Sequence, residues 1–100
     1  MTRYHGERTI DGVVVTADGA ILPTHEDKLA LTDKGFEWSY EGSEPAQLAF
    51  ALLVDHLGDA AMAEALHERF MRAIVANFEN EWEMTSADIE AAVEALRAER

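Results

Sequence analysis

The stretch from Ser43 to Leu57 constrains the fold of this chain more than any other part of the sequence. Apolar side chains cover most of the circumference that a helix over these residues would present. Beyond its first turn, the only clearly polar residues are Gln47, Asp55 and His56. Ser43 is a suitable N-cap, Pro45 fits the first turn, and Gly58 is a normal stop signal. A helix that is apolar almost all round needs other elements around it, so we expect it to be central and buried.

Two Asp-Gly pairs mark the first part of the chain as β-structure. Asp11-Gly12 and Asp18-Gly19 each stand between short runs rich in β-branched or small apolar residues. An Asp-Gly pair suits the positive φ angles of a type I′ hairpin turn. Residues 3–22 are therefore predicted to form a meander of three short strands. The segment from Pro23 to Lys34 has no clear period and is predicted to be a surface loop.

Strict alternation of aromatic and polar residues predicts a fourth strand from Phe36 to Glu41, and a shorter version recurs over residues 81–84. Trp38 and Trp82 fall on the inward faces of these strands. The outward glutamates are Glu37, Glu41, Glu81 and Glu83. Opposed like charges destabilise a strand pair. An N-terminal strand that presents Arg3, His5 or Arg8 is therefore the better neighbour for either strand.

Two amphipathic helices complete the expected order of elements. The first spans residues 60–76, with an apolar stripe opposite Glu64, Glu68 and Arg72. The second is announced by Thr85-Ser86-Ala87-Asp88, a capping box with Asp in the return position. We expect one domain over residues 1–100, of the α+β class. A small, mostly antiparallel sheet packs on three helices in the order β-β-β-β-α-α-β-α.

Residue types that carry chemistry are sparse. The sequence has no cysteine, which excludes thiol catalysis, disulfides and thiolate metal sites. None of the four histidines stands four residues from another, and His25-Glu26-Asp27 are sequence neighbours, which rarely converge on one ion. Asp55-His56 has no identifiable nucleophile nearby. We therefore expect no enzyme activity, no cofactor, and no catalytic or metal-binding residue.

Charge narrows the choice of partners. Twenty acids against eight bases give a net charge of −12, and residues 79–100 are the most acidic part, with seven acids and two bases. Nucleic acid and anionic membranes attract clustered Lys and Arg, so direct binding to either is not expected. Solubility, a salty cytoplasm and imitation of nucleic-acid phosphates each explain the acidity. The sequence leaves all three open.

Membrane and export signals are not expected either. The longest apolar stretch, residues 48–54, is far shorter than the roughly 20 residues that a membrane span needs. Residues 1–6 contain no apolar core of the kind that a signal peptide carries. We therefore expect a cytoplasmic location.

Four stretches of the chain resemble a known family. They are Tyr4–Thr9, the block from Gly35 to Ala49, Asp55–Asp59, and Trp82–Ser86 with the helix that follows. They are similar to the family catalogued as domain of unknown function six-one-six-six. The resemblance implies a cytosolic accessory protein from bacteria, haloarchaea or mobile elements such as phages, and it brings no activity with it. The family segment is usually rich in glycine where Ser39, Glu41 and Glu44 stand here, so a close approach of a ligand or partner backbone that such glycines would allow is not expected in this chain.

The sequence favours a non-enzymatic interaction module, encoded by a phage or other mobile element, that binds a basic host or defence protein. Its first candidate residues are Glu37, Glu41, Glu81 and Glu83. An anti-defence protein that mimics DNA is the most specific version of this hypothesis. Two alternatives stay open. One is a binder of a small nucleotide-like anion near Arg3, Tyr4 and Arg8, and the other is a homodimeric structural protein.

Overall fold

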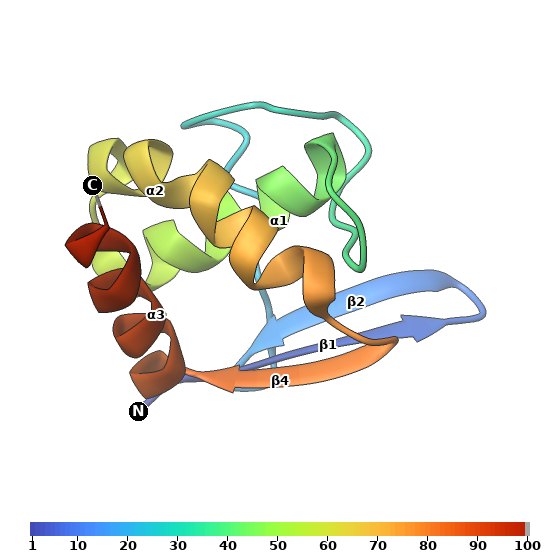
Figure 1. The fold of residues 1–100 in the computed structure, drawn as a ribbon. Helices are drawn as coiled ribbons and strands as arrows, with labels where there is room; N and C mark the ends of the chain where they lie inside the picture. The colour runs from blue at the N-terminus through green and yellow to red at the C-terminus, as the bar shows by residue number, and fades with distance from the viewer. Residues whose placement is uncertain (100) are drawn as a thin grey trace.

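A four-stranded antiparallel sheet forms one layer of the molecule, and three helices form the other (Figure 1). The computed structural model describes residues 1–99. The elements in chain order are β1 (Arg3–Thr9), β2 (Gly12–Ala17), β3 (Ala20–Ile21), α1 (Ser43–Leu57), α2 (Ala60–Ala73), the 3-10 turn η1 (Val75–Asn77), β4 (Glu81–Thr85) and α3 (Ser86–Ala98). The predicted class is confirmed: an α+β fold with an antiparallel sheet packed on three helices.

The strand order is β3-β2-β1-β4, which places β1 between β2 and β4. The expectation that the basic N-terminal strand accompanies an acidic strand is confirmed. His5 lies directly opposite Glu83 in the β1–β4 register, and its Nε2 is 2.6 Å from a carboxylate oxygen of Glu81. Arg3 Nε lies 3.7 Å from Glu83. Cross-strand pairs of opposite charge favour this arrangement of strands.

The two Asp-Gly pairs behave differently. Asp18 and Gly19 have φ angles of 51° and 85° and connect β2 to β3, as a type I′ turn requires. In the first hairpin Thr9 pairs with Gly12, so the turn residues are Ile10 and Asp11, one position earlier than predicted. Only Gly12 takes a positive φ there. The Thr9 hydroxyl fixes this turn: it accepts from the Asp11 N–H at 3.2 Å and donates to the Gly12 carbonyl at 2.8 Å.

The predicted strand from Phe36 to Glu41 is wrong. Phe36 and Trp38 do point inward and are buried, but this stretch belongs to no sheet. One backbone bond, from the Ser39 N–H to the Val75 carbonyl, ties it to another element. Ser39 has a φ of 79°, which turns the chain and leaves Tyr40 44% exposed. The alternation of aromatic and polar residues correctly predicted which side chains point inward. A β-strand, however, also requires a neighbouring strand with which its backbone forms hydrogen bonds.

The helix signals in the sequence are largely confirmed. The core of α1 is completely enclosed, and Gly58 ends it in the left-handed conformation, with φ at 66°. The N-cap, however, is Gly42 rather than Ser43, and no side chain caps that end. α2 ends at Ala73 and gives way to η1, so it is shorter than predicted. The capping box of α3 is present, with both of its reciprocal bonds made by Thr85 and Asp88.

Gln47 is a polar residue at the centre of the molecule. Its side chain is fully buried in α1. Its amide nitrogen donates to the carbonyls of Thr24 and Leu29 at 2.7 and 3.0 Å, and its oxygen accepts from the Leu31 N–H at 2.8 Å. A buried amide is stable only when it is satisfied in this way. Gln47 therefore holds the long loop between β3 and α1 against the helix layer.

Within residues 1–99, no helix combines the length and the apolar content that crossing a membrane requires.

Candidate functional site

The sheet has one face against the helices and one face without a covering layer (Figure 1). Burial alternates along β1: Tyr4 and Gly6 are buried, whereas Arg3 and Glu7 are exposed. We call the helix-packed side of the sheet the covered face and the opposite side the bare face. On β1, Tyr4, Gly6 and Arg8 belong to the covered face, and Arg3, His5 and Glu7 belong to the bare face.

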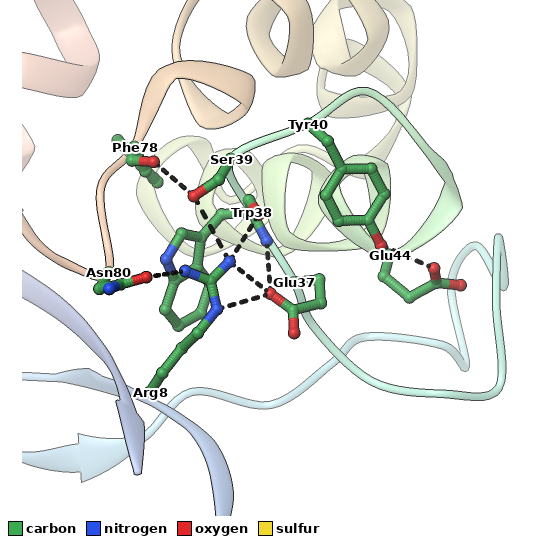
Figure 2. Close-up of polar contacts among 8 residues, drawn as sticks. All are labelled: Arg8, Glu37, Trp38, Ser39, Tyr40, Glu44, Phe78 and Asn80. Carbon is green, nitrogen blue, oxygen red and sulfur yellow. Dashed lines mark hydrogen bonds and ion pairs between the residues drawn. The ribbon is translucent and has the colours of Figure 1, made fainter.

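Arg8 is the centre of a polar cluster at the end of the covered face (Figure 2). Its Nη2 donates to Glu37 Oε1 at 2.8 Å and to the Trp38 carbonyl at 2.7 Å, and its Nη1 donates to Asn80 Oδ1 at 2.6 Å. Nε also donates to Glu37 at 3.2 Å. Ser39 extends the cluster, because its hydroxyl donates to the Phe78 carbonyl at 2.5 Å. One guanidinium thus joins β1 to the two loops that precede α1 and β4.

Aromatic rings fill the space behind this guanidinium. The Arg8 carbon Cζ lies 4.9 Å from the centre of the Trp38 ring, within the range of a cation–π contact. Trp38 meets Trp82 edge to face at 5.8 Å, and Trp82 stacks on Phe78 at 4.2 Å. Gly6 lies against the Trp82 ring so closely that a Cβ there would overlap the ring. Both tryptophans are core residues, as predicted, and they hold the cluster in place rather than forming an open cleft.

The bare face is divided into an aliphatic half and an acidic half. One row across the sheet runs through Ile21, Thr16, His5 and Glu83. The next row runs through Val14, Glu7 and Glu81. Ile21 is 70% exposed on the β3 side, and the glutamates lie on the β1 and β4 side. Ile10, at the tip of the hairpin that projects beyond the helices in Figure 1, is fully exposed.

The structure separates the four glutamates that the sequence suggested as an interaction surface. Glu81 and Glu83 lie together on the bare face. Glu37 lies in the Arg8 cluster, and Glu41 is 3.5 Å from Arg72 of α2. Each of the four has a basic partner within the chain. Sequence reasoning missed Glu7, which the period of two along β1 places on the same face as His5.

The three residues suggested for a small anion do not converge either. Arg3 lies on the bare face, whereas Tyr4 and Arg8 lie on the covered face. Tyr4 is buried, and its hydroxyl donates to Asp55 at 2.5 Å. Burial, with the Asp55 carboxylate as a further cause, raises the pKa of Tyr4 well above its usual value. Arg8 donates to acceptors of the chain itself, so these residues do not frame a common pocket.

A smaller polar group surrounds Glu44 at the start of α1. Its two oxygens accept from the Thr32 hydroxyl at 2.7 Å and from the Tyr40 hydroxyl at 3.1 Å. The bond from Thr32, followed by that from Tyr40, lowers the pKa of Glu44. Partial desolvation, together with the nearby Glu44 carboxylate, raises the pKa of Tyr40. This group holds the loop before α1 in place.

Among the residues that the structure describes, no group of three or more histidine and acidic side chains is arranged to hold a metal ion. The loop residues His25, Glu26 and Asp27, which the sequence brought forward as ligand types, form no such group.

Fold and surface together define a small α+β domain whose sheet is covered on one side only and carries acidic residues on the other. Residues 4–95 match a family of unknown function (DUF6166), and the chain belongs to this family. This agrees with the resemblance seen in the sequence. No curated protein and no solved structure matches the chain.

Proposed function

We propose that this chain is a non-enzymatic protein-interaction module that binds a basic partner protein through the bare face of its sheet. The observation that carries this proposal is the acidic half of that face, where Glu7, Glu81 and Glu83 lie side by side with no layer over them. Glu81 and Glu83 are 68% and 54% exposed. Their carboxylates can therefore accept bonds from a partner while they keep His5 and Arg3.

The aliphatic half of the face supports a protein partner over a small ion. Val14 lies opposite Glu7, and the exposed Ile21 lies opposite Thr16, so the β2 and β3 side of the same face presents aliphatic side chains. Interfaces between proteins commonly combine an apolar part with a charged rim, and the charged part sets specificity and the rate of association. A basic partner with an aliphatic patch beside its positive charges complements both halves.

The bare face favours docking of this kind over imitation of DNA. A surface that copies the phosphate backbone needs carboxylates that present their full charge. On the bare face, Glu81 lies beside His5 and Glu83 lies beside Arg3, so the charge of both carboxylates is partly offset within the chain. A basic host or defence protein remains the partner class that we propose, and it is recognised through a local patch.

Binding of short lysine-rich peptides labelled with a fluorophore tests this proposal. We compare the native chain with the double variant Glu81→Gln/Glu83→Gln at increasing salt concentrations. The double variant should lose at least about tenfold in affinity, and the affinity of the native chain should fall steeply with salt, because exposed charge pairs are screened.

The matched control is Glu64→Gln/Glu94→Gln, which removes the same charge from exposed positions on α2 and α3. This control should bind the peptides almost as well as the native chain. Equal losses in both double variants would show that only net charge matters. That result, or no binding of basic peptides at all, would refute the proposed function.

A further inference from the structure

Within residues 1–99, β4 is an edge strand whose outer side has no neighbour in the sheet. It pairs with β1 alone. The Ser86 N–H, just after β4, donates to the Thr2 carbonyl at 2.8 Å and so points toward β1. Backbone groups alternate in direction along a strand. Met84 and Trp82 therefore also bond to β1, and the N–H and C=O groups of Glu81 and Glu83 point outward from the sheet edge.

In the part of the chain that the structure describes, the outward backbone groups of Glu81 and Glu83 make no hydrogen bond. The next outward N–H, that of Thr85, is taken by the Asp88 carboxylate at 2.9 Å in the capping box of α3. At the opposite edge of the sheet, the backbone of β2 is already paired near its end. There β2 pairs with β3, and the Leu22 N–H donates to the Val15 carbonyl. The β4 edge thus offers a short, continuous set of donors and acceptors next to two carboxylates.

We propose that an extended basic segment of the partner adds to β4 as an antiparallel fifth strand. Its backbone pairs with Glu81 and Glu83, and its lysine or arginine side chains lie beside their carboxylates on the bare face. This inference rests on the proposed function and specifies how the partner is held. Strand addition at a free sheet edge is a recurring mode of peptide recognition, in which side chains at alternate positions give the specificity.

The spacing of the glutamates sets the sequence of the segment. Residues two apart on a strand point to the same face, about 7 Å from each other. A segment with basic residues at every second position therefore places one base beside Glu81 and the next beside Glu83. The positions between them face the helix layer beside Trp82 and Met84, so small or apolar residues fit there.

A second copy of this chain is a poor occupant of the same edge. Antiparallel pairing of two β4 strands would place Glu81 and Glu83 opposite the same glutamates of the other copy. Like charges that face each other across a strand pair destabilise it, and charges on an edge strand are a known protection against self-association. The same charges that oppose self-pairing attract a basic strand.

Amide hydrogen exchange measured by NMR, with an alternating lysine–threonine peptide as the probe, tests the backbone pairing directly. In the free chain the amides of Glu81 and Glu83 should exchange quickly, whereas those of Trp82 and Met84 are protected by β1. Saturation with the peptide should slow exchange at Glu81 and Glu83 by at least about tenfold, as expected for amides that enter a ladder. Exchange at Trp82 and Met84 should change little.

Two isomeric peptides provide the matched control. In one, the lysine amides are N-methylated, and in the other, the threonine amides are N-methylated. Only the lysine amides face the β4 edge in the proposed register, so only the first peptide should lose binding. Both peptides carry the same charge, so attraction between side chains alone would not distinguish them.

The outcomes separate the two proposals. Equal binding of both methylated peptides, with the Glu81 and Glu83 amides unprotected, would refute strand addition. The proposed function would still stand in that case if Glu81→Gln/Glu83→Gln weakens binding. Failure of every basic peptide to bind would refute both. Light scattering should show a monomer without peptide, and a dimer whose formation protects the Glu81 and Glu83 amides would assign the edge to a second copy instead.

Discussion

Arg3 and Arg8 belong to the same strand but to opposite faces of the sheet, and their surroundings differ sharply. On the covered face, the Arg8 guanidinium donates to Glu37, Asn80 and the Trp38 carbonyl, and it lies over an indole ring. On the bare face, Arg3 has a single ion pair with Glu83, at 3.7 Å. Polar residues of the covered face are fixed by several bonds, whereas those of the bare face keep capacity for a partner.

This contrast between the faces indicates where substitutions should affect structure and where they should affect function. A half-buried guanidinium with several acceptors cannot be replaced without leaving those acceptors unpaired. An exposed ion pair contributes between nothing and about 1 kcal/mol, because water screens it. Substitutions on the covered face should therefore change stability, and substitutions on the bare face should change binding.

The largest effect is expected for Gly6→Ala on the covered face. The added Cβ would overlap the Trp82 ring, and a shift of that ring would disturb its contacts with Trp38 and Phe78. Overpacking of this kind should lower the free energy of unfolding by about 3 kcal/mol. Glu7→Ala, the next residue on the bare face, should change it by less than about 0.5 kcal/mol. Urea denaturation followed by tryptophan fluorescence measures both, and similar losses in the two variants would contradict the difference between the faces.

A medium effect is expected when the two arginines are changed to lysine. Arg8→Lys keeps the charge but loses the planar guanidinium, whose several N–H groups donate to Glu37, Asn80 and the Trp38 carbonyl at the same time. We expect a loss of about 2 kcal/mol in the free energy of unfolding. Arg3→Lys should be close to neutral. Thermal unfolding of both variants at the same pH checks this, and the contrast between the faces fails if Arg3→Lys destabilises the chain as much as Arg8→Lys.

The smallest effect concerns Tyr4 and alkaline pH. Burial and the bond to Asp55 raise the pKa of Tyr4 in the folded chain above the value of about 10 for an unfolded tyrosine. Below a pH of about 10, the stability that Tyr4 contributes is fully present. As pH rises above this value, that stability is lost, because the tyrosine of the unfolded chain releases its proton first. Tyr4→Phe should cost about 1 kcal/mol at neutral pH and should flatten the decline in stability above pH of about 10.

Tyr40→Phe is the control for this measurement. Tyr40 is 44% exposed, and although desolvation and Glu44 raise its pKa, a group that is in contact with water contributes less to the pH dependence of folding. Chemical denaturation across alkaline pH should show a steeper decline in Tyr40→Phe than in Tyr4→Phe. A steeper decline in Tyr4→Phe than in Tyr40→Phe would show that Tyr40, and not the buried Tyr4, causes the loss of stability at alkaline pH.

Several sequence-based predictions were correct because they depend on neighbours along the chain. The capping box at Thr85, the stop at Gly58 and the turn at Asp18-Gly19 all use residues within a few positions of one another. The pairing of a basic strand with the glutamates after residue 80 was also correct, since opposite charges favour adjacent strands. Of the four glutamates that the sequence suggested as an interaction surface, Glu81 and Glu83 lie together on the bare face, and Glu37 and Glu41 do not join them.

The sequence by itself determined where the three helices lie, the turn at Asp18-Gly19 and which side chains of each strand point inward. It did so because helix caps, turn geometry and hydrophobic period act over short distances along the chain. Only the tertiary structure decided that residues 36–41 find no ladder partner, that Gln47 holds a distant loop, and that Arg8 meets Glu37, Asn80 and the Trp38 carbonyl. These outcomes depend on which backbone lies beside which, and contacts between segments far apart in sequence leave no local period to read.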